Sequence, residues 1–253
     1  MKIALLSDIH ANLPALEAVL SDIEKRAPDA VYCLGDLVGY APWPNEVIAE
    51  IRGCRIPTIA GNYDYGVGLN SNDCGCAYKT EKDKERGQQS IKLTNELISE
   101  DNRSFLKTLP AHIRLEIGYP PKQCSMLMVH GSPRKINEYL FEDRTDKSFK
   151  RIMEGSNAGL LAFGHTHKPF HKVIEDGDSF KHAINIGSVG KPKDGDSRAC
   201  YTMLEWDGTV DCAKPDWFSV SFIRVGYEIE KTMKAIKDSA LPNAFADMLQ
   251  HAY

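Results

Sequence analysis

Met1-Lys2-Ile3-Ala4-Leu5-Leu6-Ser7-Asp8-Ile9-His10 opens the chain. Ile3 to Leu6 form an unbroken apolar run without alternation, which is typical of a strand buried on both faces. The run leads into Asp8-x-His10, and side chains two residues apart on a strand point to the same side. We therefore expect one carboxylate and one imidazole to leave the end of this buried strand together.

The same arrangement recurs along the chain, because further apolar runs lead into polar side chains that often follow or precede a glycine. A single Asp or His at such a place is usually a turn residue or a structural polar group. Repetition after successive buried strands favours a ligand site, since open α/β sheets bind ligands at the carboxyl ends of their strands. The candidate ligands are Asp8, His10, Asp36, Asn62, His130, His165 and His167.

The chemistry of this set indicates a transition-metal site. Imidazole combined with carboxylate and amide oxygen suits Mn, Fe, Zn or Ni, and it disfavours a structural zinc of the cysteine type. The neighbouring glycines should let the backbone turn sharply around a metal. These glycines are Gly35, Gly61, Gly131 and Gly164.

Composition narrows the class of protein. The 253 residues are 42% apolar and 26% charged, and a net charge of −4 does not suggest a nucleic-acid binder or a protein of acidic membranes. No run of 18 apolar residues predicts a membrane-spanning helix, and the chain begins in a core strand rather than a signal peptide. Seven scattered cysteines indicate reduced thiols and a cytoplasmic protein. Cys74-x-Cys76 lacks zinc-knuckle spacing, so we expect two loop thiols.

The first half of the chain follows a βαβ pattern. A helix should begin near Asn12 and Pro14 and end before Pro28, between strands at 3–6 and 30–34. A second helix around 44–51 leads to a third strand at 56–60. Such a unit is parallel and right-handed.

Residues 65–110 interrupt this pattern with a polar segment that we interpret as a surface insertion or cap. Helices are expected around Ile91–Ile98 and after Ser99. The second half predicts a series of short strands, with a break at Pro120-Pro121 and closing helices over 228–239 and 242–251. The strands are expected at 112–117, 126–129, 160–163, 170–174, 180–186, 199–205, 209–212 and 220–225. Because both halves supply ligands, we predict a single domain over residues 1–253 with two packed sheets.

These motifs resemble the calcineurin-like metallophosphoesterases. The resemblance runs from residue 3 to about 190 and includes the block Asn185–Gly190, which is similar to a downstream block of small bacterial and archaeal phosphodiesterase-type members. It implies an α/β fold, a four-layer αββα sandwich with two mixed β-sheets. It also implies two metal ions. One would be held by Asp8, His10, Asp36 and His167, and the other by Asp36, Asn62, His130 and His165.

The resemblance also implies a mechanism in which two metal ions about 3.5–4 Å apart, bridged by Asp36, activate a hydroxide that attacks phosphorus in line with the leaving oxygen. Asp36, Asn62, Tyr63 and His130 are the implied catalytic residues. Family members commonly have histidine where this chain has Tyr63, and that histidine is thought to protonate the leaving group or hold the phosphate. A phenol with a pKa of about 10 is a poorer acid near neutral pH. Tyr63 could instead be a packing aromatic.

Three possible functions of the protein are compared. A metal-dependent phosphodiesterase comes first, and a phosphoprotein phosphatase or dinucleoside polyphosphate hydrolase second, with Trp43, Tyr63 or Tyr65 available to stack a base. A non-catalytic scaffold of the same fold is third, and the complete ligand set argues against it. We expect a small-molecule or nucleotide-type phosphoester as substrate, no membrane partner and no stable nucleic-acid complex; a homo-oligomer is compatible with the sequence.

Overall fold

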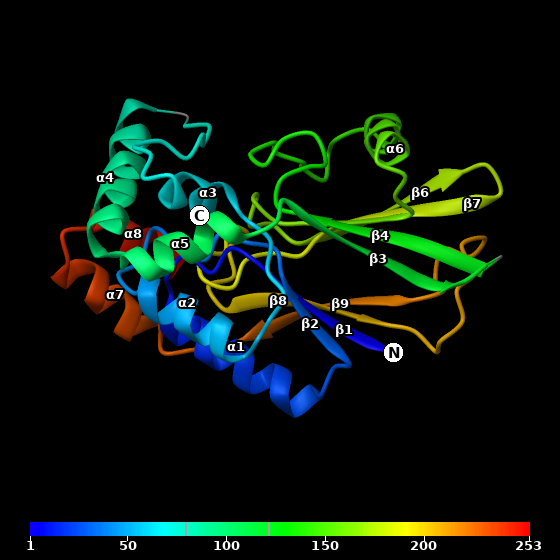
Figure 1. Ribbon diagram of the computed structural model, residues 1–253, viewed down its shortest axis with the longest axis horizontal. Helices are drawn as coiled ribbons and strands as arrows, with labels where there is room; N and C mark the ends of the chain where they lie inside the picture. Colours follow the sequence, from blue (N-terminus) through cyan, green and yellow to red (C-terminus); the bar gives the residue numbers. More distant parts are fainter. Residues whose placement is uncertain (79, 121) are drawn as a thin grey trace.

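Two β-sheets lie face to face in the computed structural model, which describes residues 1–78, 80–120 and 122–253 (Figure 1). Lys79, in the predicted insertion, and Pro121, in the predicted strand break, lie outside the described residues. The first sheet has the order β2 (Ala30–Cys33), β1 (Lys2–Leu6), β8 (Ala199–Glu205) and β9 (Ser219–Val225). β1 pairs in parallel with β2 and antiparallel with β8, so this sheet is mixed.

The second sheet is also mixed. Its spatial order is β3 (His112–Tyr119), β4 (Lys122–Val129), β5 (Leu160–Phe163), β7 (Ser179–Asn185) and β6 (Phe170–Asp176). β4, β5 and β7 are parallel, and the two edge strands are antiparallel to their neighbours. The carboxyl ends of β4 and β5 therefore meet at one edge of the sheet.

The side chains of β1 show why the sheets stack. Ile3 and Leu5 pack into the core between the two sheets, together with Met128 of β4. Ala4 and Leu6 face the opposite way, into a core shared with α1 (Leu13–Arg26) and α2 (Pro44–Gly53). α6 (Asp146–Gly155) covers the outer face of the second sheet. The predicted burial of β1 on both faces and the four-layer αββα arrangement are confirmed.

Two predicted strands are wrong. Residues 56–60 make only an isolated parallel bridge between Thr58 and Cys33, because the N–H of Ala60 turns away to the carbonyl of Pro110. Residues 209–212 form no strand; Val210 is buried between the sheets, in the connection of residues 206–218 between β8 and β9. Asp207-Gly208 is thus part of a longer loop rather than a tight hairpin.

Helices gather at the end of the sheets toward which β1 and β2 run (Figure 1). They are α3 (Asn62–Gly68), α4 (Glu81–Leu97), α5 (Glu100–Thr108), α7 (Ile229–Asp238) and α8 (Ala244–His251). The side chain of Ser99 accepts a hydrogen bond from the N–H of Asn102, so the predicted cap is confirmed. Among the described residues, no helix has the length and apolarity needed to cross a membrane.

Candidate metal centre

The loops that follow the central strands bring all seven predicted ligands together. Six of them form two buried groups, within each of which the potential ligand atoms lie within 4.8 Å of one another. The first group is Asp8, His10 and His167, and the second is Asp36, His130 and His165. Buried carboxylates and imidazoles in one place are costly unless they are paired or bind a metal.

Asp36 stands between the two groups. Its Oδ2 atom lies 3.3 Å from Nε2 of His130 and 3.7 Å from Nε2 of His10. Its Oδ1 atom accepts the backbone N–H of Tyr63 at 2.8 Å. One oxygen of Asp36 is thereby fixed to the backbone, and the other faces both groups.

Asn62 joins the second group through its carbonyl oxygen. Its Oδ1 atom lies 3.1 Å from Nε2 of His130, while its amide nitrogen donates to the backbone oxygen of Cys74 at 2.9 Å and to the sulfur of Cys76 at 3.3 Å. Of the two predicted loop cysteines, Cys76 thus contacts Asn62 through its thiol and Cys74 through its backbone carbonyl. Among the described residues, no cysteine belongs to either metal-ligand group.

The histidine rings are oriented by backbone carbonyls. The Nδ1 atoms of His10, His130 and His167 lie 3.0, 2.8 and 2.5 Å from the carbonyl oxygens of Val38, Leu34 and Lys191. An Nδ1–H that donates to a carbonyl leaves the Nε2 lone pair free, which is the usual arrangement around metal-binding histidines. In the first group, the Nε2 atoms of His10 and His167 face each other at 3.2 Å.

Two buried polar atoms are positioned to accept a cation between these side chains. Asp8 Oδ1 and His165 Nε2 have no hydrogen-bond partner among the described residues. Buried polar atoms without a partner are rare in native proteins. The donor set of oxygen and imidazole nitrogen without thiolate suits first-row transition metals.

The backbone of five ligands adopts the left-handed region, which corrects the expectation that the paired ligands leave the strands themselves. β1 ends at Leu6 and β5 at Phe163, before the ligands begin. For residues other than glycine, a positive φ is uncommon and is concentrated at functional sites. The φ angles are 54° for Asp8, 50° for His10, 54° for Asp36, 66° for His165 and 61° for His167.

Two neighbouring loops are locked together close to Asp36. A Cβ atom at Gly61 would lie 2.1 Å from Oδ1 of Asp36, so this position has room only for glycine. The carboxylate of Asp64 accepts the N–H groups of Leu37 and Gly61 at 2.8 and 3.0 Å. Burial, together with the negative charge of Asp36, raises the pKa of Asp64 to about 7. Asp64 therefore positions the loops rather than serving as a ligand.

The ionisable side chains of the second group shift one another's pKa values. Burial lowers the pKa of His130, but the charge of Asp36, its hydrogen bond to the ring and the charge of Asp8 together outweigh burial and raise this pKa to about 10. Burial of His165, with a further contribution from His130, lowers its pKa to about 3. The negative charge of Asp36 thus acts on the neighbouring histidines, as expected of a carboxylate that several ligands share.

The block Asn185–Gly190 supports the loops from behind. The amide of Asn185 donates to the carbonyl of Gly164 at 2.8 Å and to the hydroxyl of Thr166 at 2.9 Å. The hydroxyl of Ser188 donates to the carbonyl of Asp8 at 2.8 Å. These contacts fix the backbone on both sides of the histidine pair and beside Asp8.

Tyr63 lies behind the metal-ligand groups. Its side chain is 1% exposed, and its hydroxyl has no partner among the described residues. The ring packs edge to face against His10, with centroids 5.4 Å apart, and in a tilted arrangement against Tyr40. Burial raises the pKa of Tyr63 well above its ordinary value. This geometry is that of a packing aromatic.

Sequence reasoning missed Tyr139. This half-buried ring lies against His165, with centroids 4.1 Å apart, and its hydroxyl accepts the N–H of Ala77. Nearby, the amide of Asn137 donates to the carbonyl of Gly75 at 2.8 Å. The only sequence signal was the Gly131-Ser132-Pro133 turn after a buried strand.

Comparisons with known proteins agree with this geometry. The model of the calcineurin-like phosphoesterase superfamily domain matches residues 1–209. An uncharacterized protein of Methanocaldococcus jannaschii is 36% identical over 263 residues, which span 98% of this chain and 96% of its own.

Solved structures show the same fold. A metallophosphoesterase from Sphaerobacter thermophilus has a TM-score of 0.74 and 29% identity, with 100% of this chain and 99% of that chain covered. A hypothetical protein from Pyrococcus horikoshii OT3 has a TM-score of 0.80 and 23% identity over 100% and 98% of the two chains, and it shows the fold alone. Phosphoester hydrolysis is the activity that the matched family implies, and divalent metal ions are its usual cofactors. This chain belongs to the calcineurin-like phosphoesterase superfamily.

Proposed function

We propose that the protein is a metal-dependent phosphodiesterase with a dinuclear centre. The observation that supports this most directly is the position of Asp36, whose Oδ2 atom faces His10 of one group and His130 of the other. Asp8, His10, Asp36 and His167 would hold one ion. Asp36, Asn62, His130 and His165 would hold the second, with Asp36 shared.

The donor set favours an anionic substrate. Asp8 and Asp36 are the carboxylates among the seven ligands, and Asn62 contributes a neutral oxygen. When bound, two divalent ions, of Mn, Fe, Zn or Ni, would supply Lewis acidity toward the phosphoryl oxygens and lower the pKa of a water between them. Two carboxylate charges leave such a centre net positive, which suits a phosphate ester.

The chain's own residues position the reacting groups. Backbone carbonyls orient the Nε2 atoms of His10, His130 and His167, so little reorganisation is required during the reaction. The backbone N–H of Tyr63 holds Asp36 in its shared orientation. The cap helices α3, α4 and α5 lie at the same end of the molecule as these ligands, and we propose that they act with the sheets as a single domain that limits access to the centre.

Tyr63 favours diesters that have good leaving groups. Its hydroxyl is buried and its pKa is raised, so it is poorly suited to protonate a leaving oxygen. An aryl diester departs as a stabilised phenolate and requires little protonation, whereas an alkyl monoester departs as a basic alkoxide. We therefore propose a small-molecule or nucleotide-type phosphodiester as substrate.

A second candidate is a hydrolase of dinucleoside polyphosphates. The observation that favours it is a cavity of about 620 Å³ beside the centre, whose lining includes Cys76, Lys135, Tyr139, and Arg134 with its ion-pair partner Glu138. An aromatic ring with adjacent cations could receive a base and a polyphosphate. A phosphoprotein phosphatase and a non-catalytic scaffold have no comparable observation in their favour.

A substrate panel on Mn-loaded protein tests these alternatives. The compounds are an aryl phosphodiester, an aryl monophosphate, a phosphopeptide and diadenosine tetraphosphate. We expect the highest kcat/KM on the aryl diester and up to two metal ions per chain by elemental analysis. A preference for the phosphopeptide would contradict the diesterase assignment, and less than about 0.2 metal equivalents at saturation would contradict the dinuclear centre, because full ligation should give high affinity.

A further inference from the structure

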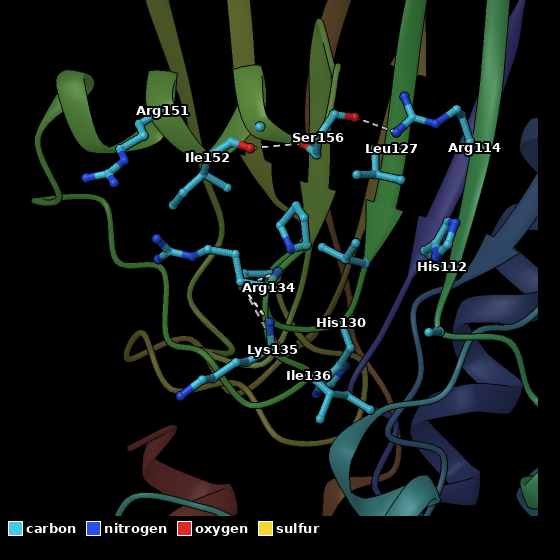
Figure 2. A pocket seen from close by; sticks show the side chains of 15 residues that line it. His112, Arg114, Leu127, His130, Arg134, Lys135, Ile136, Arg151, Ile152 and Ser156 are labelled. Atoms are coloured by element: carbon cyan, nitrogen blue, oxygen red, sulfur yellow. Dashed lines mark hydrogen bonds between the residues drawn. The ribbon is translucent and has the colours of Figure 1, made fainter.

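A cavity of about 630 Å³ lies next to the metal centre. Its walls come from the β3–β4 pair, the last turn of α6 and the turn of residues 132–136 (Figure 2). His130 is the residue that this lining shares with the two metal-ligand groups. We call this space the α6 cavity.

The lining of the α6 cavity carries positive charge. No Asp or Glu is among the residues that line it, although the whole chain has a net charge of −4. Figure 2 shows basic side chains on both sides of the space. The basic and imidazole residues are His112, Arg114, Arg134, Lys135, Arg151 and His130.

Two of these cations are used by the fold. The guanidinium of Arg114 donates to the backbone oxygens of Asn157 and Ser156 at 2.8 and 2.6 Å, which ties the end of α6 to β3. Arg134 forms an ion pair with Glu138. Their charges contribute to the local potential, but their donors are largely occupied.

The other two cations are available. Within the described part of the chain, the side chains of Lys135 and Arg151 take part in no hydrogen bond and no ion pair. Figure 2 places them on the same side of the cavity, one on the 132–136 turn and the other on α6. Both side chains are exposed, and Figure 2 shows Arg134 between them. Guanidinium and ammonium groups are the usual recognition elements for phosphate.

The floor of the α6 cavity is apolar. Leu127 and Val129 of β4, Ile136 of the turn and Ile152 of α6 contribute aliphatic side chains. The lining has no aromatic residue apart from the imidazoles of His112 and His130, so it offers little for stacking a nucleobase. A ligand that fits both features has a dianionic head and a compact apolar body.

We propose that the α6 cavity binds organic phosphates of this kind, as a ligand site separate from the metal centre. The anionic head would lie between Lys135 and Arg151, and the apolar body would rest on Leu127 and Ile152. The 132–136 turn leads on to Tyr139, which packs against His165, so a ligand here contacts the segment that borders the centre. Lys135 also lines the cavity beside the centre, so Arg151, which lines the α6 cavity and not the other, is the residue that distinguishes the two sites.

Phenylphosphonate is the probe, because its carbon–phosphorus bond resists hydrolysis at the metal centre. Binding is measured by titration calorimetry at low ionic strength on metal-loaded protein and on its Asp36→Asn variant. We expect saturable binding to both. Arg151→Gln and Lys135→Gln should each weaken it about 10-fold, the scale of one charge-assisted hydrogen bond. Methylphosphonate, which lacks the ring, should bind several-fold more weakly, since less apolar surface is buried.

Lys147→Gln is the matched control. Lys147 is exposed on the same helix as Arg151 but does not line the cavity, so the variant removes an equal charge and should leave binding unchanged. The proposal is overturned if phenylphosphonate does not bind at millimolar concentration, or if Arg151→Gln and Lys147→Gln have equal effects. It is also overturned if binding disappears in Asp36→Asn and is unaffected by both cavity variants, because the anion would then lie at the metal centre. Circular dichroism confirms that each variant is folded.

Discussion

The molecule buries histidines in two places, and the two environments differ. At the metal centre, three Nδ1 atoms lie beside backbone carbonyls, and the Nε2 atoms face Asp8, Asp36 or Asn62. In the second sheet, His171 and His182 instead contact each other, with Nε2 of His171 3.0 Å from Nδ1 of His182. Phe218 packs edge to face on His182.

The difference shows what distinguishes a candidate metal site from a structural histidine pair. Both places contain a buried Nε2 atom without a partner among the described residues, that of His165 at the centre and that of His182 in the sheet. Within the described ranges, only the centre adds carboxylates within 4 Å of the rings. Burial of histidine alone therefore does not indicate chemistry, whereas shared carboxylates and carbonyl-oriented rings do.

Substitution of Asp36 should have the largest effect. Asp36→Asn removes the charge that the two ligand groups share, so metal content should fall and kcat should drop about 10²-fold or more, the scale of losing a key electrostatic stabiliser. Steady-state kinetics and elemental analysis measure both quantities. Asp22→Asn, a change of the same kind beside Tyr201 and far from the centre, is the control. Near-normal turnover and metal content in Asp36→Asn would refute the shared-ligand assignment.

Removal of a supporting residue should have the next largest effect. Asn185→Ala deletes the amide that fixes Gly164 and Thr166, and metal affinity should fall about 10- to 100-fold, as for other partners of metal ligands. Competition with a chelator measures this affinity. Asn45→Ala removes an amide that bonds to Leu97 and Ser99 away from the centre. If the two variants lose equal affinity, Asn185 has no specific role.

The contribution of the His171–His182 pair to the free energy of unfolding should depend on pH. Burial, with a smaller contribution from His171, lowers the pKa of His182 to about 4. The unfolded state then binds more protons than the folded state below about pH 6.5, so stability decreases as the pH falls toward 4. Between pH 7.5 and 5 the loss from this group should be about 2 kcal/mol.

Denaturant unfolding of metal-free protein at both pH values measures this loss. His182→Gln cannot titrate, so its free energy of unfolding should decrease by about 2 kcal/mol less over the same interval than that of the parent. Equal pH dependence in the two proteins would show that His182 does not govern it.

Tyr63 should have the smallest effect. Tyr63→Phe removes a hydroxyl that has no partner among the described residues, so kcat/KM for an aryl diester should change less than about 3-fold. A large loss would show that the phenol takes part in the reaction. Tyr63→His would increase alkyl monoester hydrolysis about 10- to 10³-fold only if its imidazole reaches the leaving oxygen. Because Tyr63 packs edge to face on His10, this variant tests whether an imidazole at position 63 can reach the leaving oxygen.

The sequence by itself determined the order of the buried strands that carry the site and the identity of all seven converging side chains. Apolar runs followed by Asp, Asn or His are local patterns, and parallel strands place their carboxyl ends at one edge. Because these patterns are local, they also explain why two strands were predicted wrongly. Residues 56–60 have a strand-like composition, but the hydrogen bond from Ala60 to Pro110 draws the chain away from the sheet.

Only the tertiary structure decided which atoms face each other. His10 and His167 approach to 3.2 Å across 157 residues of sequence, and Leu34 orients His130 across 96. The left-handed backbone of the ligand loops, the burial of Tyr63 and the contact of Tyr139 with His165 likewise depend on how the loops pack. Spacing along the chain carries no information about such distant contacts, because they arise only when the sheets stack and their loops meet.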